Sequence, residues 1–260
     1  MKEKYSLTDL HCHILPGIDD GASNEEKALQ LLKTEYDSGI RQIALTSHFD
    51  CEDLSLDTFL ELRMKAYERL MQEIKNSEME WEDLKLKLGA EVYFSPNLCH
   101  LDVKKLCMEG TTFLLLELPV ERLPAYFNET IYQIQACGVT PIIAHVERYQ
   151  YVMHNPVILC DWIDSGIYTQ MNAGTLLRYG KNSKIYFNML KWRLVNVLAS
   201  DTHSMSRRPP NLLNATKKID KQLGYQMTDK IFQNADLIFN GIHPEIVTIH
   251  CPRKIMGRWR

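Results

Sequence analysis

The stretch Ser6-Leu-Thr-Asp-Leu-His-Cys-His13 is a short apolar run that ends in two histidines. Four further runs have the same form, with apolar residues giving way to polar side chains and a turn: 41–48, 85–91, 140–145 and 194–203. Interpreted as strands, the five runs carry these residues at their carboxyl ends: His11, His13, His48, Glu91, His145, Asp201 and His203. Asp19 and Asp20 follow in the first turn. Because active-site loops of α/β folds converge at that edge, the sequence predicts one metal-rich site assembled from the whole chain.

Strand-like and helix-like segments alternate along the rest of the chain. Residues 112–118 and 167–172 also have the pattern of strands, which makes seven. Helices are expected at about 124–137, 156–165, 183–192 and 212–223, after two earlier amphipathic ones. This alternation favours a parallel sheet with helical crossovers. Seven units whose strand ends share ligands favour an α/β fold of the closed, distorted (β/α)7 TIM-like barrel type over an open sheet.

Capping residues mark the first two helices. Ser23-Asn-Glu-Glu26 has the form of a capping box, and Gly39 predicts the C-terminal end of the helix that it opens. Asp57 predicts the cap of the next helix.

The composition is that of an ordinary globular protein. Its 260 residues are 24% charged and 45% hydrophobic, and we expect one domain over 1–260 with a basic C-terminal tail at about 241–260, solvated or partly docked. A net charge of -3 lacks the basic footprint of a nucleic-acid binder. The start has no apolar signal segment, and the apolar run 113–119 is too short to span a bilayer. We therefore expect no membrane insertion and a cytoplasmic location.

The seven cysteines fit that location, because their number is odd and their spacing irregular. We expect them to be packing residues. None has an arginine six positions later, so the phosphate loop of cysteine-based phosphatases is absent.

Strand geometry supports metal binding. Side chains at i and i+2 point the same way, so His11 and His13 converge, as do Asp201 and His203. Two imidazoles beside several carboxylates would be costly to bury without compensation, and this donor set suits zinc, manganese or iron. Asp9 shares the face of His11 and is expected to orient a ligand. The other histidines are interpreted as structural: His100, His154, His243 and His250.

The ordered motifs resemble those of the polymerase and histidinol phosphatase (PHP) superfamily. They are Asp9-Leu-His-Cys-His-Ile-Leu-Pro-Gly-Ile-Asp-Asp-Gly21, Thr46-Ser-His48, Gly89-Ala-Glu91, Ala144-His-Val-Glu-Arg-Tyr149 and Ala199-Ser-Asp-Thr-His203. Within the superfamily, the chain is similar to bacterial manganese-dependent protein-tyrosine phosphatases of capsule and exopolysaccharide operons. The motifs run from Asp9 to Arg208, which is most of the chain. The resemblance implies a distorted (β/α)7 barrel of the PHP type.

The resemblance also implies a site for up to three divalent metals, with Mn²⁺ as the expected ion and iron, zinc or cobalt as alternatives. His11, His13, Glu91 and Asp201 would hold one ion. Glu91 would bridge to a second ion held by His48 and His145, and Asp20 and His203 would hold a third. The sequence alone leaves open whether Asp19 or Asp20 is the ligand.

Two arginines match the functional arginines of the family. The resemblance implies that Arg148 assists the leaving group and that Arg208 binds phosphate. Since an arginine with a pKa above about 12 is a poor proton donor, we expect Arg148 to act mainly by electrostatic stabilisation. The planar guanidinium of either residue matches phosphate oxygens.

A few other residues near the strand ends have two interpretations. Glu117 and Asn172 could be hydrogen-bond partners of ligands or simply turn residues. Tyr149, Phe49 and Tyr93 could contact an aromatic substrate ring, although core packing or loop anchoring is the more common role.

The resemblance predicts a metal-dependent phosphatase that acts on phosphotyrosine in protein and so regulates capsule or exopolysaccharide synthesis. Its expected partner is a bacterial tyrosine kinase with a tyrosine-rich tail. Two alternatives stay open: a small-molecule phosphatase of histidinol-phosphate type, and a non-catalytic, metal-stabilised scaffold module. The sequence does not set the oligomeric state, so an oligomer also stays open.

Overall fold

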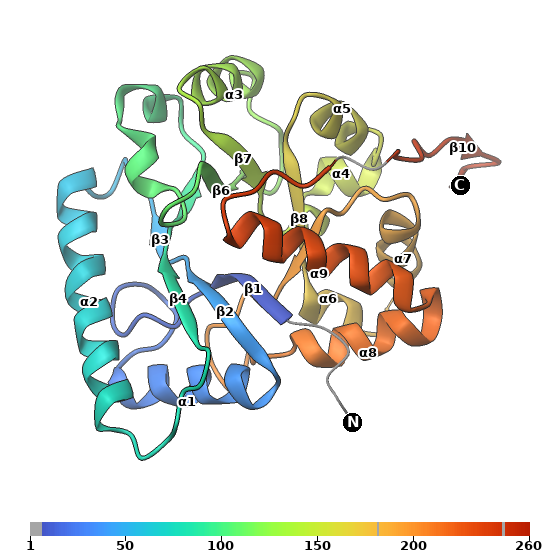
Figure 1. Cartoon of the computed structure of the whole chain (residues 1–260). Coiled ribbons are helices and arrows are strands. Elements are labelled where there is room, and N and C mark those ends of the chain that lie inside the picture. Colours follow the sequence, from blue (N-terminus) through green and yellow to red (C-terminus); the bar gives the residue numbers. More distant parts are fainter. Residues whose placement is uncertain (1–6, 181, 246–247) are drawn as a thin grey trace.

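The computed structural model describes residues 7–180, 182–245 and 248–260, and it shows a mixed α/β fold built on parallel strands (Figure 1). Three strands form a sheet in the order β1-β2-β4, and six form a second sheet in the order β3-β5-β6-β7-β8-β9, which curls as a half-barrel. The strands are β1 Leu7–Cys12, β2 Ile40–Leu45, β3 His48–Phe49, β4 Lys85–Leu88, β5 Glu91–Tyr93, β6 Phe113–Glu117, β7 Thr140–Ile143, β8 Tyr168–Asn172 and β9 Val197–Ala199. Ser6, the predicted start of the first strand, lies outside the described residues.

Two strands of the first sheet lead almost directly into strands of the second. Only two residues separate β2 from β3, and only two separate β4 from β5. At this join the Glu91 amide donates to the Thr46 carbonyl at 3.2 Å, and at the other edge the Asp201 amide donates to the His11 carbonyl at 2.9 Å. Each of the seven predicted runs therefore contains a strand, and the carboxyl ends of the runs lie together.

Helices connect the strands and cover the outside of the sheets (Figure 1). Their apolar faces are buried; α2, for example, buries Phe59, Ala66 and Leu70. The α-helices are α1 Glu25–Asp37, α2 Leu56–Asn76, α3 Phe127–Ala136, α4 Gln150–His154, α5 Ile158–Asp164, α6 Ala173–Leu177, α7 Ser183–Lys191, α8 Leu212–Leu223 and α9 Tyr225–Phe239. Three 3-10 helices cover Pro96–His100, Val103–Leu106 and Val146–Arg148.

Two predicted helix caps are wrong by one or two residues. Asn24 rather than Ser23 caps α1, and its side chain accepts a hydrogen bond from the first turn at 3.0 Å. Ser55 rather than Asp57 caps α2, with a corresponding hydrogen bond of 3.2 Å. Asn, Ser and Asp are all good N-caps, so neighbouring candidates could not be separated by residue type. The predicted end of α1 at Gly39 is confirmed, since this residue has φ of 89° directly after the C-cap.

Helix α9 was not predicted, and it closes one end of the strands. It crosses in front of them in Figure 1. Ala235, Ile238 and Phe239 of α9 form an apolar cluster with residues in or directly after six strands: Leu10, Ala44, Phe113, Leu115, Ile142, Ala144, Tyr168 and Val197. The Lys87 side chain donates to the carbonyl oxygen of Phe239 at 2.6 Å, which satisfies a free carbonyl at the end of the helix. This end is opposite the carboxyl ends that carry the predicted ligands.

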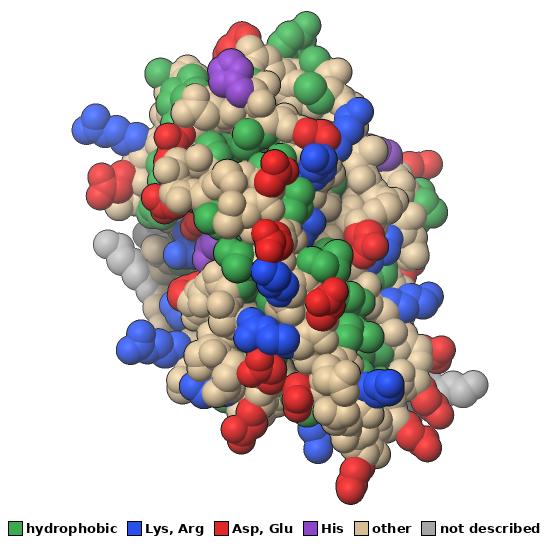
Figure 2. Space-filling model, turned by 90° about the vertical axis from the view of Figure 1, so that its left-hand side faces the viewer, with side chains coloured by type: hydrophobic (Ala, Val, Ile, Leu, Met, Phe, Trp, Pro, Cys, Tyr) green, Lys and Arg blue, Asp and Glu red, His purple; other side chains and the backbone are tan. Residues whose placement is uncertain are grey.

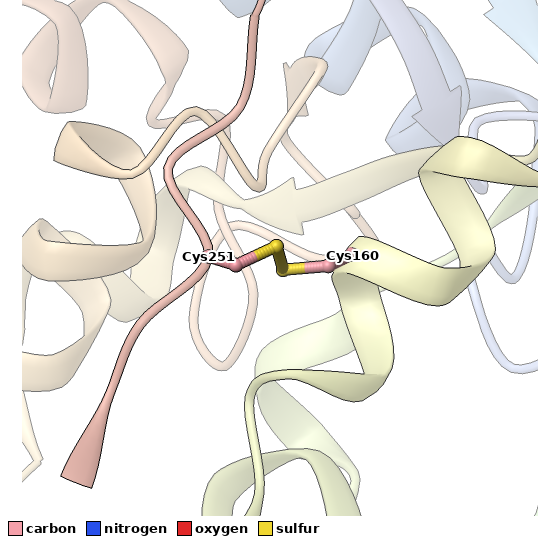
Figure 3. The surroundings of a disulfide bond; sticks show 2 residues. All are labelled: Cys160 and Cys251. Carbon is pink, nitrogen blue, oxygen red and sulfur yellow. A yellow bond between two sulfur atoms is a disulfide. The ribbon is translucent and has the colours of Figure 1, made fainter.

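The prediction that all cysteines are packing residues is wrong for two of them. Cys160 of α5 forms a disulfide with Cys251 of the tail, and their Cα atoms lie 6.0 Å apart (Figure 3). The two residues are 91 positions apart, and no local spacing pattern marks such a pair. Cys12 and Cys107 are buried free thiols, as expected. The other free cysteines are partly or fully exposed: Cys51, Cys99 and Cys137.

The described part of the basic tail is docked against the body. The His250 amide donates to the Trp192 carbonyl at 2.9 Å, and the Trp259 indole donates to the His154 carbonyl at 3.2 Å. A short antiparallel hairpin ends the chain, formed by β10 Lys254–Ile255 and β11 Arg258–Trp259. Of the two alternatives for the tail, partial docking is thus observed.

Among the described residues, no helix combines the length and the apolar character needed to cross a bilayer. The face over α2 carries acidic and basic side chains interspersed with each other (Figure 2). This mixture matches the small net charge of -3.

Candidate metal centre

Four predicted ligands converge at the carboxyl ends of the strands. His11 and His13 come from the end of β1, Glu91 begins β5, and Asp201 follows β9. The Nε2 atoms of His11 and His13 lie 3.1 Å apart, and they lie 3.0 Å and 3.1 Å from Glu91 Oε2. Asp201 Oδ1 lies 3.5 Å and 3.6 Å from the same two nitrogens. All four side chains are buried, so they form one enclosed set of nitrogen and oxygen donors.

The outer nitrogens of the two histidines fix their tautomers. His11 Nδ1 lies 3.2 Å from Gln170 Oε1, and His13 Nδ1 lies 2.8 Å from Asp19 Oδ2. Gln170 Oε1 also accepts from the His145 amide at 2.8 Å, which identifies it as the amide oxygen. Both Nδ1 atoms therefore face acceptors and carry a proton, so in the neutral imidazoles the Nε2 lone pairs point at each other and at Glu91. Lone pairs in that arrangement fit a divalent cation.

Glu91 serves two sides of the site with its two oxygens. Oε2 faces His11 and His13, and it also lies 3.2 Å from His48 Nδ1. Oε1 lies 2.8 Å from His145 Nε2. Glu117 joins this second side, because its Oε1 lies 3.4 Å from His145 Nε2. His48, Glu91 and Glu117 form a second group of donor atoms close enough to share an ion.

A third group lies nearer to solvent and consists of His13, Asp20, His48 and His203. Asp20 Oδ1 lies 3.2 Å from His203 Nε2 and 3.5 Å from His48 Nε2. His203 Nδ1 faces the Asp201 carbonyl at 2.9 Å, so its buried Nε2 carries the lone pair, and this atom has no hydrogen-bond partner in the described chain. The structure thus brings all eight predicted ligands to one place.

Asp19 and Asp20 occupy different environments. Asp19 accepts from His13 Nδ1 and from the backbone amides of His48 and Gly21, and its side chain is only 4% exposed. Asp20 is 62% exposed and faces His48 and His203. Asp19 therefore contacts the outer side of an imidazole, whereas Asp20 faces the inner side of two others.

Both predicted functional arginines reach the cluster from its solvent side. Arg208 donates to Asp20 Oδ2 at 2.9 Å and to Asp201 Oδ1 at 3.3 Å. Arg148 Nη1 lies 3.9 Å from Asp201 Oδ2. Their side chains are 32% and 43% exposed, so both guanidinium groups can meet an anion that arrives from solvent.

Burial lowers the pKa values of the cluster histidines, and neighbouring charges either oppose or reinforce this effect. Burial lowers the pKa of His13, but Asp19 and Glu91 outweigh it and raise the pKa to about 10. At His145, Glu117 and Glu91 likewise outweigh burial and raise the pKa to about 9. His203 is buried beside the positive charge of His13, and its pKa falls to about 3. The cluster without bound ions therefore holds protons at some imidazoles and lone pairs at others.

Two of the converging residues have left-handed backbone conformations. His145 has φ of 31° and Asp201 has φ of 52°, which are uncommon for residues with a side chain. The His145 amide donates to Gln170 Oε1, and the Asp201 amide donates to the His11 carbonyl. An unfavourable backbone conformation persists where surrounding contacts hold it in place, and these hydrogen bonds supply that restraint.

Sequence reasoning missed Gln170, which lies at the centre of a buried amide relay. Gln170 Nε2 donates to Asn172 Oδ1 at 2.8 Å, and Asn172 Nδ2 donates to Asp201 Oδ2 at 2.6 Å. The relay thus links His11 to Asp201 through two residues of β8. Of the two interpretations of Asn172, the structure shows a hydrogen-bond partner of a predicted ligand rather than a turn residue. The sequence signal for Gln170 was that it lies two residues before Asn172, so that both side chains point to the same face of the strand.

The remaining residues singled out in the sequence have the following positions and contacts. Asp9 accepts from the backbone amide of His11, at 3.3 Å, rather than from its imidazole. Tyr149 and Phe49 are buried core residues, whereas Tyr93 is 38% exposed at the end of β5. None of the three donor groups in the described chain includes the histidines interpreted as structural: His100, His154, His243 and His250.

Comparison with known proteins identifies the family. The sequence model of the family described as "Capsular polysaccharide synthesis, CpsB/CapC" matches residues 7–240. The chain belongs to the CpsB/CapC family. Among relatives, the tyrosine-protein phosphatase CpsB of Streptococcus pneumoniae is 30% identical over 243 residues, covering 87% of this chain and 95% of the relative. The tyrosine-protein phosphatase YwqE of Bacillus subtilis is 27% identical over 239 residues, covering 89% and 91%.

The fold of the family is also found among solved structures. A chain from the crystal structures of B. subtilis YwqE and S. pneumoniae CpsB, described as unique metal-dependent tyrosine phosphatases, matches with a TM-score of 0.82 and 24% identity. The match covers 94% of this chain and 99% of that one. The arrangement of strands and helices described above is therefore the CpsB/CapC fold.

Proposed function

We propose that this chain is a metal-dependent protein-tyrosine phosphatase. The family membership and the names of the relatives support the reaction class. The observation that carries the proposal is the approach of two imidazole Nε2 atoms to 3.1 Å beside the Oε2 atom of Glu91. Donors placed in this way hold cations, and a cluster of cations suits a dianionic phosphate monoester.

We assign the ligands as the family resemblance implies. One ion would be held by His11, His13, Glu91 and Asp201, a second by Glu91, His48 and His145, and a third by Asp20 and His203. The inward position of Asp20 supports its choice over Asp19. Manganese is the proposed ion, with iron, zinc or cobalt as alternatives, because imidazole and carboxylate suit all of them. Such ions would neutralise phosphate oxygens and lower the pKa of water.

The remaining chemistry falls to the protein's own residues. Arg208 would donate hydrogen bonds to the phosphate from the part of its guanidinium edge that is open to solvent, while its contacts to Asp20 and Asp201 hold its orientation. Arg148 would lie beside the departing phenolate and stabilise its negative charge. Gln170 would hold the His11 imidazole with its Nε2 lone pair directed inward.

We also infer the finer architecture and the biological setting. Continuity of the two sheets supports a distorted (β/α)7 barrel of the PHP type. The family description supports a role in capsule or exopolysaccharide synthesis. As the protein substrate we propose a phosphotyrosine-bearing bacterial tyrosine kinase, which the resemblance implies. A cytoplasmic location belongs to the same proposal, since the kinase tail would have to reach the site.

One assay tests the function. The purified protein is stripped with chelator, reloaded with manganese or magnesium, and given a phosphotyrosyl peptide, a phosphoseryl peptide and histidinol phosphate. We expect chelation to abolish activity and manganese to restore it better than magnesium, with the phosphotyrosyl peptide preferred. Preference for histidinol phosphate would identify a small-molecule phosphatase, and no hydrolysis of any ester would favour a scaffold. Full activity in excess chelator would contradict the metal assignment.

A further inference from the structure

A cavity opens directly beside the metal centre. Its volume is about 220 Å³, and it lies between α6, the end of β9 and the segment that follows His203. Asp201 and Arg208 line it, and both also belong to the candidate metal centre. A group bound in this cavity would therefore neighbour a phosphate bound at the metals. Neither the predicted ligand set nor the family resemblance assigns a role to this cavity.

The cavity carries an excess of positive charge. Arg178, Arg207 and Arg208 all line it, against the single carboxylate of Asp201. That carboxylate already accepts from Arg208 and from Asn172 Nδ2. In the described part of the chain, neither Arg178 nor Arg207 forms a side-chain ion pair, and both are exposed. Two guanidinium groups are thus available to an incoming anion.

The other walls suit the end of a side chain rather than a free ion alone. Leu177 and Pro209 supply apolar surface, and Asn211 supplies an amide whose buried Oδ1 has no hydrogen-bond partner in the described chain. Gly174 lets Asn211 approach, because a Cβ atom added at Gly174 would lie 2.9 Å from Asn211 Nδ2. The apolar walls suit a methylene stem, the arginines suit the anionic group at its end, and Asn211 Oδ1 can accept a hydrogen bond from a peptide N–H.

We propose that this cavity binds an anionic side chain of the substrate peptide, next to the phosphotyrosine that is hydrolysed. This inference rests on the proposed function and adds a sequence preference to it. The anionic group is a carboxylate of Asp or Glu or the phosphate of a second phosphotyrosine, since a guanidinium fork pairs with either. Small esters such as nitrophenyl phosphate have no second anionic group. An ester of this kind that occupies the metal centre therefore has no group to place in the cavity.

The test compares peptides that differ only in charge around one phosphotyrosine. Glutamate is placed in turn at each of the three positions on either side, with glutamine at the same position as the neutral partner, and one further peptide carries a second phosphotyrosine. The manganese-loaded wild-type protein should hydrolyse at least one acidic peptide about fivefold to tenfold faster in kcat/KM than its neutral partner, as expected for two exposed charge pairs. The preference should shrink at high salt. The diphosphorylated peptide shows whether phosphate replaces carboxylate.

Variants locate the preference. Arg178→Gln/Arg207→Gln should abolish the preference and leave nitrophenyl phosphate hydrolysis unchanged, whereas Arg178→Lys/Arg207→Lys should keep most of it. Lys75→Gln/Lys221→Gln removes the same charge from exposed positions on α2 and α8 and should change nothing. Equal rates for acidic and neutral peptides in the wild type would overturn the inference. So would a preference that survives the double glutamine variant, or an equal loss on nitrophenyl phosphate. If no phosphotyrosyl peptide is hydrolysed at all, the proposed function itself fails.

Discussion

The two ends of the same strands bury opposite kinds of side chain. Along β6, Phe113 and Leu115 join the apolar cluster with α9, while Glu117, two residues further on, joins the metal-ligand groups. Along β8, Tyr168 joins that cluster, whereas Gln170 hydrogen-bonds beside the ligands. Because alternate residues of a strand share one face, each strand changes from apolar to polar along a single row of side chains.

This difference separates the source of stability from the source of chemistry. At the α9 end, apolar surface is removed from water at roughly 25 cal/mol per Å². At the ligand end, histidines and carboxylates are desolvated, and their mutual attraction offsets that penalty only in part. We therefore expect substitutions at the α9 end to lower the free energy of unfolding, and substitutions at the ligand end to lower turnover.

The largest expected effect comes from Glu91→Gln. The change keeps the shape of the side chain, but it removes the charge that faces His11, His13, His48 and His145. We expect kcat/KM for nitrophenyl phosphate to fall at least about 10²- to 10³-fold, in line with the loss of a central electrostatic group. Far-UV circular dichroism should stay that of the folded protein, since the apolar cluster with α9 is separate. A variant that retains more than about a tenth of wild-type activity would contradict the central role of Glu91.

At the opposite end, Phe239→Ala should act on stability instead. The Phe239 side chain is 1% exposed and belongs to the cluster that closes the strands. Truncating a buried Phe costs about 3–5 kcal/mol, which urea unfolding would measure as a lower free energy of unfolding. Activity of the folded variant should stay close to wild type. Tyr132→Ala, at a side chain that is 69% exposed on α3, is the control and should change stability by less than about 0.5 kcal/mol. A large loss of turnover with unchanged stability in Phe239→Ala would show that the two ends are coupled.

The apolar end was only partly predictable from the sequence. Strands could be located because their apolar runs are bounded by turns, and six helices could be predicted from the sequence pattern between them. Helix α9 was missed although it buries Ile231, Ala235 and Ile238, because Asn234 and Asp236 interrupt the run. Those polar residues make sense only with their partners, since Asn234 donates to the Asn196 carbonyl and Asp236 accepts from the Gln42 side chain.

The ligand end was more predictable, because most of the predicted ligands stand in or shortly after a strand that positions them. The sequence could not separate Asp19 from Asp20, as adjacent residues in a turn have no fixed period. The structure separates them by burial and partners. Gln170 was missed for a related reason, since an amide acquires a role only through the distant groups that it contacts. The Cys160–Cys251 disulfide likewise depends on a contact between segments far apart in the chain.

Gln170→Leu should give an intermediate effect at the ligand end. The change removes the acceptor for His11 Nδ1 and for the His145 amide, so the His11 imidazole and the backbone at His145 each lose a hydrogen bond that fixes their orientation. Losing such a partner typically lowers metal affinity or activity about 10- to 100-fold, and titration with manganese would measure the affinity. Gln170→Glu keeps an acceptor oxygen and should recover part of the loss. Thr169→Val, which removes a buried hydroxyl from the neighbouring position of β8, should lower stability without changing manganese affinity. Equal affinity losses in the Leu and Val variants would reduce Gln170 to a general structural role.

The smallest expected effect is a pH dependence of stability in the metal-free protein. Asp19 and Glu91 outweigh burial and raise the pKa of His13 from 6.5 to about 10. A group whose pKa is raised on folding stabilises the fold fully below its unfolded pKa, and that contribution is lost as pH rises through the folded pKa. The free energy of unfolding, measured with urea in chelator, should therefore fall between pH 6.5 and about 10.

Asp19→Asn should flatten this fall, because it removes one of the two carboxylates that hold the proton on His13. Asp19 itself is ionised in both states throughout this range, so its own titration adds no slope. His145, with a pKa of about 9, contributes a slope of the same sign in both proteins, so the difference between their curves isolates the pair of Asp19 and His13. Identical curves for the two proteins would mean that this carboxylate does not hold the proton on the imidazole.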